Sequence, residues 1–299
     1  MKRHSILLFI FLVYFFSNTF SQKLAGPNVL VVIAHPDDES GCAATIYKIT
    51  HELGGKADVC VITNGEGGYK YSTLAESYYG LELTDEKVGR ENLPGIRKKE
   101  LMNAGKIIGV RNIFFLDQKD DKYGLDEKDP LDTIWDTTLV KHRLQQIMTT
   151  THYDFIFCLL PYPQTHAHHK AATILALRTV SEMPSEKRPI ILGVGFSSKS
   201  DTIKTKFSQL EGYKETKILI STPVFVLDRT VKFGYKDRLN YQIVVNWEIA
   251  EHKSQGTMQM NAEDYENFQI FDINGPGAIE KTQTLFDRLK FIPYPQKTY

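Results

Sequence analysis

Short runs of apolar, mostly β-branched residues alternate in the first half of the chain with longer stretches that carry apolar residues at helical spacing. The apolar runs predict buried strands at 28–34, 58–63, 112–116 and 154–160. The stretches between them predict helices at 40–53, 96–108 and 133–150. Strands and helices in this alternation are typical of an α/β fold, with a mostly parallel sheet and helices on both faces.

The second half of the chain has a mixed pattern. It predicts two further strands and a helix at 190–196, 218–227 and 246–255, and it leaves 264–273 ambiguous. No repeat, low-complexity tract or linker divides the sequence, so we expect residues 22–299 to form a single domain. The polar region that ends at Pro94 is too long for a simple connection, which predicts a functional loop or a partly helical lid.

The first residues have the three-part pattern of a secretory signal. A basic start at Met1–His4 precedes the apolar run 6–16, and a small polar segment follows it. This run is shorter than the roughly 20 residues that span a bilayer. We therefore expect residues 1–21 to be removed after Ser21, which leaves an exported protein, periplasmic or secreted, without a stable membrane span. An uncleaved anchor is the alternative interpretation.

Composition excludes some function classes. The 36 basic and 36 acidic residues give a formal net charge of zero, so nothing favours nucleic acid, which usually requires a basic face. The acidic run 117–132 is offset by its own lysines, and we interpret it as a solvated loop. Cys42, Cys60 and Cys158 lack the spacing of a zinc site or a disulfide framework, so we expect buried free thiols.

Two polar clusters follow predicted strands, at the edge where open α/β sheets bind ligands. Ala34–Glu39 (AHPDDE) comes directly after the first strand, and His166–His169 (HAHH) comes shortly after the fourth. Together they meet the needs of a catalytic zinc site, in which three nitrogen or oxygen ligands leave a fourth position for water. Taken separately, the first cluster is also explained as helix capping and the second as solvated surface histidines.

Spacing suggests how the roles divide among these residues. His35 and Asp38 are three residues apart, so their side chains converge at a turn that opens a helix. Asp37 then lies beside the metal, where a carboxylate can take a proton from an activated water. His169 would complete the ligand set, and His166 would face the substrate. Spacing alone does not decide which of Asp37 and Asp38 is the ligand.

At these motifs the sequence resembles the PIG-L/LmbE-like zinc deacetylases. The segments that carry the resemblance are Ala34–Glu39, Thr63–Glu66, Arg97–Glu100, His166–His169 and, more weakly, Ala250–Gln255. The resemblance implies a Rossmann-like fold and removal of an acetyl group from N-acetylglucosamine-type amines. It also implies these roles: zinc held by His35, Asp38 and His169, Asp37 as general base, and His166 as the group that stabilises the oxyanion or protonates the leaving amine. Ligands of this type also accept Fe2+ or Co2+.

One position departs from the family pattern. The last motif is usually His-x-Asp-His, and here His168 stands where the acid is expected. That acid normally orients and charges the neighbouring histidine. Its absence puts the protonation of His166 in doubt, unless another carboxylate from a loop substitutes for it.

Two further residues are candidate substrate contacts. Arg97 either reaches a substrate hydroxyl or phosphate, or pairs with Glu100 along its helix. Glu66 and the glycines after it either line the pocket or only turn the chain. We therefore interpret the chain as an exported zinc-dependent N-deacetylase whose partner is a small-molecule or glycan substrate, an acetylated amino sugar or glycoconjugate. A carbohydrate-binding protein on a weakened deacetylase scaffold and a hydrolase of other small amides are the alternatives.

Overall fold

The computed structural model describes residues 25–201, 207–255 and 263–294. Its strands are β1 (Asn28–Ile33), β2 (Lys56–Thr63), β3 (Val110–Gln118), β4 (Phe155–Leu159), β5 (Ile190–Ser197), β6 (Phe225–Asp228) and β7 (Tyr265–Ile270). They form one sheet in the order β3-β2-β1-β4-β5-β7-β6. The first five strands are parallel, and β7 runs antiparallel to β5 and β6. The predicted mostly parallel α/β fold with a mixed C-terminal part is confirmed.

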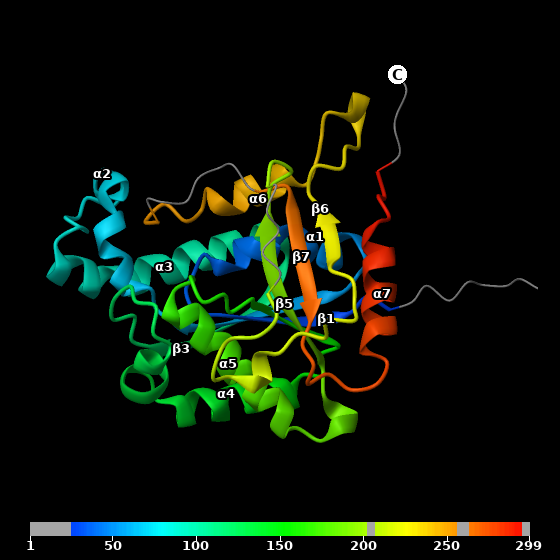
Figure 1. The fold of residues 1–299 in the computed structure, drawn as a ribbon. Helices are drawn as coiled ribbons and strands as arrows, with labels where there is room; N and C mark the ends of the chain where they lie inside the picture. The colour runs from blue at the N-terminus through cyan, green and yellow to red at the C-terminus, as the bar shows by residue number, and fades with distance from the viewer. Residues whose placement is uncertain (1–24, 202–206, 256–262, 295–299) are drawn as a thin grey trace, which may run out of the picture.

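The sheet is covered by helices on both faces, as predicted (Figure 1). The helices are α1 (Ala43–Tyr47), α2 (Glu76–Tyr79), α3 (Glu86–Ile108), α4 (Thr137–Thr150), α5 (Ala167–Glu182), α6 (Gln242–Ile249) and α7 (Ala278–Leu289). Residues of the central strand β1 alternate between two separate cores, Val31 in one and Leu30 in the other. Core residues of α1, α3, α6 and α7 join Val31, and those of α4 and α5 join Leu30. A strand buried on both faces is apolar at every position, and the continuous apolar run at 28–34 is the pattern from which β1 was predicted.

The stretch predicted as a helix at 40–53 is broken into three short segments. A 3-10 turn, η1 (Asp38–Cys42), leads into α1, and the π-helical η2 (Lys48–Glu52) ends the stretch. The break at the start has a local cause, because the Asp38 carboxylate turns back to accept the backbone N–H groups of Ala34 and His35 at 3.1 and 2.9 Å. This tight turn is incompatible with a regular α-helical first turn.

Helix α3 is longer than the predicted 96–108. It begins after Asp85, whose side chain accepts the N–H of Val88 at 2.9 Å as an N-cap, and it continues through Pro94. The prediction stopped at Pro94 because proline lacks the N–H that an interior helical position uses. The polar region before it holds η3 (Glu66–Tyr71), a second 3-10 turn and α2, so the expectation of partly helical structure is confirmed.

Other boundaries differ from the predictions. Helix α5 (Ala167–Glu182) was not predicted, although apolar residues follow its histidines at helical spacing. The expected strand at 218–227 is reduced to β6, which begins after Pro223, because proline cannot donate to a strand ladder. The expected helix at 246–255 ends at Ile249 in α6, and turns follow it. The ambiguous stretch 264–273 contains β7.

The helix predicted at 133–150 also starts later than expected. The π-helical η5 (Asp129–Ile134) comes first, and α4 then begins after Asp136, whose side chain accepts the N–H of Leu139 at 2.9 Å. The N-cap therefore sets the start of the helix, rather than the apolar pattern.

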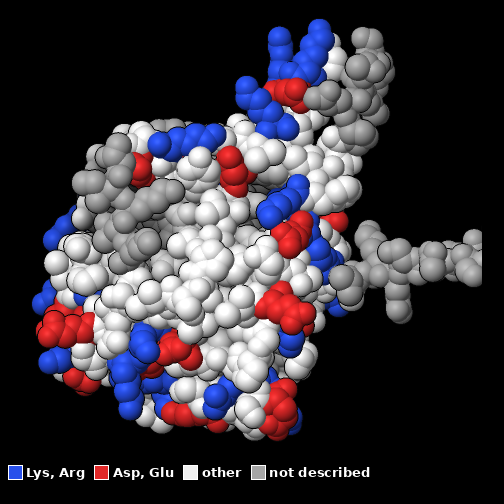
Figure 2. Space-filling model, turned by 45° about the vertical axis from the view of Figure 1, so that its right-hand side comes forward, with Lys and Arg blue, Asp and Glu red and all other residues white. Residues whose placement is uncertain are grey.

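Cys42, Cys60 and Cys158 are buried and free, as predicted. Within the described ranges, no helix combines the length and apolar character needed to cross a membrane. Residues 1–21 lie outside those ranges, so the secretory signal stays a prediction. Figure 2 shows side chains of both charges around the edges of the face drawn and mainly uncharged side chains over its centre.

Candidate active site

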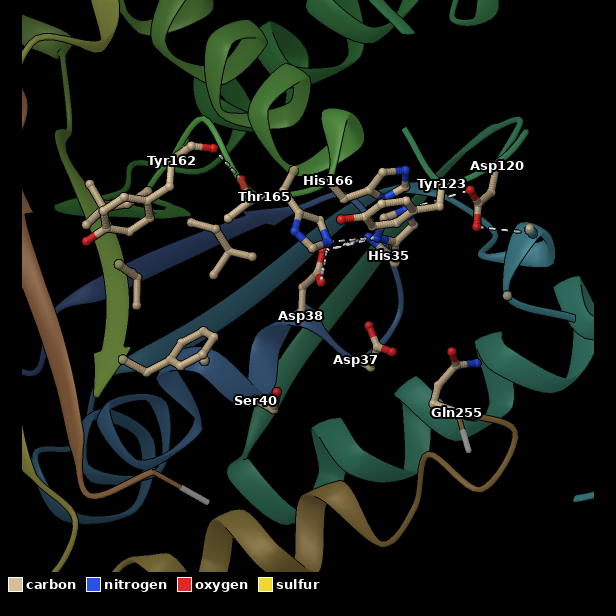
Figure 3. A pocket seen from close by; sticks show the side chains of 18 of the residues that line it. His35, Asp37, Asp38, Ser40, Asp120, Tyr123, Tyr162, Thr165, His166 and Gln255 are labelled. Carbon is tan, nitrogen blue, oxygen red and sulfur yellow. Dashed lines mark hydrogen bonds and ion pairs between the residues drawn. The ribbon is translucent and has the colours of Figure 1, made fainter. Parts of the chain in front are cut away.

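The candidate site lies where the strand order of the sheet changes direction. From β1 the chain moves to β2 on one side, and from β4 it moves to β5 on the other, so the loops after β1 and β4 diverge and leave a crevice. A cleft of about 580 Å³ opens there. The loop after β1 supplies His35, Asp37 and Asp38 (Figure 3). The start of α5 supplies His166 and His169. The two predicted clusters are therefore brought together.

Three side chains converge on one point in this cleft. Nδ1 of His35 lies 3.1 Å from Nε2 of His169, and Nε2 of His169 lies 3.1 Å from Oδ1 of Asp38. The other carboxylate oxygen, Asp38 Oδ2, lies 3.7 Å from His35 Nδ1. Bonds of about 2.0–2.1 Å to a tetrahedral zinc ion place neighbouring ligand atoms about 3.3 Å apart. The donor set and its spacing thus fit a divalent cation.

Asp38 is held in the form that a metal ligand needs. Burial acts to raise the pKa of its carboxyl, but His169 and His35 outweigh this effect and hold the pKa well below the usual range. The backbone N–H groups of Ala34 and His35 donate to Oδ2 and fix the direction of the carboxylate. Asp38 is therefore an ionised, oriented donor beside two imidazoles.

Asp37 points into the same cleft and is not part of the converging group (Figure 3). Its carboxylate accepts from the Arg97 guanidinium at 3.1 Å, and its backbone N–H donates to Glu39 Oε2 at 3.0 Å. Burial raises the pKa of Asp37 to about 7, against the opposing charge of Arg97. Asp38 faces the two histidines and Asp37 does not, which favours Asp38 as the ligand and leaves Asp37 as the free carboxylate.

His166 borders the cleft at the N-cap position of α5. Its ring stacks between those of His35 and Tyr123, with centroid separations of 5.1 and 5.0 Å, and its Nε2 lies 3.1 Å from the Lys122 carbonyl oxygen. Burial lowers the pKa of His166 to about 3, and the neighbouring His35 and His168 add to this effect. No carboxylate of the described chain lies within ion-pair distance of His166, so its ring is neutral at pH 7.

Asp120, which sequence analysis placed in a solvated loop, is a buried part of the site. It follows β3, and its Oδ1 lies 3.2 Å from His168 Nδ1 and 3.8 Å from His35 Nε2. Burial acts to raise the pKa of Asp120, but His35 and His168 hold it below the usual range. The interpretation of 117–132 as solvated was wrong at this position, because the Asp120 carboxylate is buried against His168 and His35, while Lys119 pairs with Asp121 instead. The one available sequence signal was a carboxylate four residues after the end of the predicted strand 112–116.

Arg97 and Glu66 support loops of the site. The Arg97 guanidinium is buried and donates to the carbonyl oxygens of Gly65 and Pro36 as well as to Asp37. It does not pair with Glu100, so that alternative was wrong. The Arg97 side chain borders the cleft, which keeps a substrate contact as a prediction. Glu66 Oε1 accepts the N–H of Asp120 at 3.1 Å, and Glu66 is not among the residues that line the cleft.

A second buried group of ionisable side chains lies behind Asp37. His252 Nε2 is 2.7 Å from Glu39 Oε1 and 3.2 Å from Glu248 Oε1, and all three side chains are inaccessible to solvent. Burial and the neighbouring Glu39 raise the pKa of Glu248 to about 8. Burial acts to lower the pKa of His252, but Glu39 and Glu248 hold it well above the usual range. This group ties the 250–255 segment, the weakest predicted motif, to the loop that carries Asp37.

The two arms of the cleft differ in chemistry. On one side of the converging histidines the lining is polar and includes Asp37, Arg97 and Gln255. On the other side, the ends of β4 and β5 supply an apolar wall formed by Leu159, Leu160, Tyr162, Val194 and Phe196. Figure 3 shows Tyr162 and Gln255 on opposite sides of the centre.

Comparisons with known proteins agree with this geometry. The chain is similar to the probable N-acetyl-α-D-glucosaminyl L-malate deacetylase 2 of Bacillus cereus, with 26% identity over 176 residues that cover 59% of this chain and 71% of that protein. The protein of the same name from Bacillus subtilis is 29% identical over 163 residues, which cover 54% of this chain and 64% of that protein.

Among solved structures, GalB, the 4-carboxy-2-hydroxymuconate hydratase of Pseudomonas putida KT2440, matches with a TM-score of 0.51 and 16% identity, over 82% of this chain and 95% of that chain. A deacetylase–teicoplanin complex matches with a TM-score of 0.50 and 12% identity, over 81% and 97%. At these identities the likeness shows the fold alone, and the two proteins are named for different reactions. The sequence pattern of the GlcNAc-PI de-N-acetylases matches residues 30–180, which is half of the chain and includes both clusters of the site. The chain therefore belongs to the PIG-L family, the GlcNAc-PI de-N-acetylases.

Proposed function

We propose that this chain hydrolyses the acetamide of an N-acetylated amino sugar or of a glycoconjugate that carries one, with a divalent cation held by His35, Asp38 and His169. The observation that carries the proposal is the convergence of these three donors, 3.1–3.7 Å apart, beside the separate carboxylate of Asp37. Family membership and relatives named as deacetylases of an N-acetylglucosaminyl compound support the substrate class.

A divalent cation in such a site acts as a Lewis acid toward the amide carbonyl and activates a water molecule. The chain's own part is then to move protons. Asp37 faces the cleft with a pKa of about 7, which suits a general base at neutral pH, and it takes a proton from the attacking water. Zinc fits the two imidazoles and one carboxylate, and Fe2+ or Co2+ fits the same donors.

The leaving amine must receive a proton as the C–N bond breaks. His166 is neutral at pH 7 and its Nε2–H donates to the Lys122 carbonyl oxygen, so its Nδ1 offers a lone pair to the N–H of the amine rather than a positive charge. Asp37, which carries the proton taken from water, is the group that returns it to the amine. Acetate and the free amino sugar are the products.

The test is acetate release from a panel of N-acetyl amino sugars by the purified protein, together with its metal content. We expect about one cation per chain and release that Asp37→Ala abolishes. Sugar binding without acetate release would favour the alternative of a carbohydrate-binding protein. Hydrolysis of unrelated small amides, without acetate release from any amino sugar, would favour the alternative of a hydrolase of other small amides. Absence of bound cation would overturn the ligand assignment.

We further propose that residues 1–21 direct export, so that the substrate lies outside the cytoplasm. The support is the basic, apolar and small-polar pattern of this segment. Mass spectrometry of the protein recovered from the producing organism tests it, with Gln22 expected as the first residue. A retained Met1 in a cytoplasmic fraction would contradict it.

A further inference from the structure

The structure contains a carboxylate at the place where the family motif loses one. The motif His166–His169 carries His168 instead of the usual acid, and a buried acid from another loop, Asp120, reaches the same place. Asp120 follows β3, whereas His168 lies in the first turn of α5, so the two are far apart in sequence. Their meeting is a property of the fold that the motif itself does not reveal.

Asp120 is fixed from three directions. Its Oδ1 faces His168 Nδ1 at 3.2 Å and His35 Nε2 at 3.8 Å, and its Oδ2 accepts the backbone N–H of Gly67 at 3.1 Å. Its own N–H donates to Glu66 Oε1 at 3.1 Å. The side chain is 6% exposed, so water does not satisfy it in place of these partners. Because the Asp120 carboxylate is fixed in this way, it can fix the orientation of the neighbouring His35 and His168 rings.

The protons of the two histidines can be assigned from their surroundings. His35 turns Nδ1 toward His169 and Asp38, so this nitrogen must offer a lone pair to a cation and the proton sits on Nε2. A lone pair on His168 Nδ1 would face a carboxylate, so this nitrogen also carries a proton. His35 Nε2 and His168 Nδ1 lie only 3.2 Å apart. The negatively charged Oδ1 of Asp120 lies 3.2 Å from His168 Nδ1, and from 3.8 Å its charge attracts the N–H of His35 Nε2 without a direct hydrogen bond.

We propose that Asp120 is a positioning residue that orients the metal ligand His35, and His168 beside it. The proposal rests on the proposed function only in that His35 holds a cation. Carboxylates behind metal-bound histidines fix the tautomer and ring direction and raise the basicity of the ligand nitrogen. Asp120 thereby keeps the Nδ1 lone pair of His35 aimed at the cation.

The first test measures metal affinity, without substrate. Zn2+ and Co2+ dissociation constants are determined by chelator competition for the wild type, Asp120→Asn and Asp121→Asn. The asparagine at 120 can still accept the Gly67 N–H but lacks the charge, and we expect it to weaken binding by about 10–100-fold. Asp121→Asn removes the same charge from the adjacent, more exposed residue and is expected to leave affinity unchanged. Equal affinity of the wild type and Asp120→Asn would overturn the proposal.

The second test asks whether the carboxylate can be moved. Nδ1 of histidine and Oδ1 of aspartate are both bonded to Cγ, so His168→Asp in the same rotamer places an oxygen near the present Nδ1, 3.2 Å from His35 Nε2. We expect the double variant Asp120→Asn with His168→Asp to regain most of the affinity that Asp120→Asn loses. It should also restore the visible absorption of the Co2+ form. If neither the metal affinity nor the Co2+ absorption recovers in the double variant, Asp120 only stabilises its loop, and the proposal is overturned.

Two further outcomes separate this proposal from the proposed function. A wild-type chain that binds no divalent cation would overturn the metal centre itself. Two cations per wild-type chain would overturn the positioning role, because His35, Asp120 and His168 would then be ligands of a second cation. The expected result is that the wild type binds one cation tightly, that Asp120→Asn binds it more weakly, and that the double variant regains the affinity. This result supports the role of Asp120 whichever amide the enzyme hydrolyses.

Discussion

Asp37 has a backbone conformation that non-glycine residues rarely adopt, with φ of 132°. Such conformations cost about 1–3 kcal/mol and persist only where surrounding contacts hold them. Here Glu39 accepts the Asp37 N–H, and Arg97 donates to the Pro36 carbonyl oxygen and to the Asp37 carboxylate. The result is that Asp37 and Asp38, although adjacent, point to different places, which suits the proposed roles of Asp37 as base and Asp38 as ligand.

This division predicts different losses from neighbouring substitutions. Asp37→Asn removes the general base and is expected to lower kcat by about 10²–10⁴-fold, while the protein keeps its bound cation. Asp38→Asn weakens a ligand, so cation content and activity should fall together. Metal analysis and acetate release, measured on the same preparations, check both. Loss of the cation from Asp37→Asn, or full activity of either variant, would contradict the assignment.

The buried group behind Asp37 predicts a pH dependence of stability. Glu39 and His252 face Glu248, and burial with Glu39 raises the Glu248 pKa from 4.5 to about 8. Between these values the folded protein holds a proton that the unfolded chain has released, so stability falls as pH rises through this window. His252, whose pKa is raised, acts in the same direction above 6.5.

Glu248→Gln should therefore flatten the response, because the amide resembles the protonated acid and cannot titrate. We expect the loss of Tm between about pH 6 and about pH 9 to be smaller in this variant than in the wild type. Glu251→Gln is the matched control, because this partly exposed carboxylate lies near the same helix end. Equal slopes in the wild type and Glu248→Gln would show that Glu248 titrates normally.

At the scale of elements, sequence was informative where local pattern and tertiary position agree. Buried parallel strands are apolar on both faces, so β1, β2 and β4 stand out, and the polar clusters that follow β1 and β4 identify His35, Asp38 and His169 as neighbours. The pattern misled where a local signal was overruled. Pro94 lies inside α3, because packing of the 23-residue helix outweighs the loss of one hydrogen bond.

The site was only partly predictable for a related reason. The role of Asp120 depends on His168, which follows a different strand and is 48 positions away in sequence, and no local pattern carries that information. The surrounding lysines suggested solvent, yet Asp120 is buried while its neighbour Asp121 is more exposed. His252 was visible only as part of a weak motif, and its contact with Glu39 joins positions 213 residues apart. Contacts of this kind require the fold.

The apolar arm of the cleft predicts a preference among substrates. Phe196, at the end of β5, is 52% exposed and forms part of this arm with Tyr162 and Leu159. An amino sugar with an apolar group next to the acetamide would bury that group here, whereas a free N-acetyl sugar would not. We expect Phe196→Ala to raise KM for an aryl glycoside by about tenfold, as loss of a buried aromatic contact does, with kcat little changed.

Val226→Ala is the control for this prediction. Val226 is 44% exposed on β6, which β7 separates from β5, and it does not line the cleft. It should leave KM unchanged for aryl and free sugars alike. If Phe196→Ala raises KM equally for the aryl glycoside and the free N-acetyl sugar, the aryl group does not bind against Phe196.

At the scale of the whole molecule, the site joins segments that the chain itself keeps apart. The loops after β1, β2, β3 and β4 all end at the same edge of the sheet, and they supply His35, Gly67, Asp120 and His169. His35 and His169 are 134 positions apart in sequence. The parallel sheet therefore does the positioning, and each loop contributes one or two groups.

A cation held between such distant segments should stabilise the whole fold. A ligand that binds only the folded state, at a free concentration about 100-fold above its Kd, adds about 2.7 kcal/mol to the free energy of unfolding, which for a chain of this size raises Tm by about 4–5 °C. We expect chelation of the purified protein to lower Tm by this amount and Zn2+ to restore it. Mg2+, which prefers oxygen ligands, should restore less. In Asp38→Asn, which lacks one ligand, Tm should respond weakly to either treatment. A wild-type Tm that is indifferent to chelator and zinc would mean that no cation links the loop after β1 to α5.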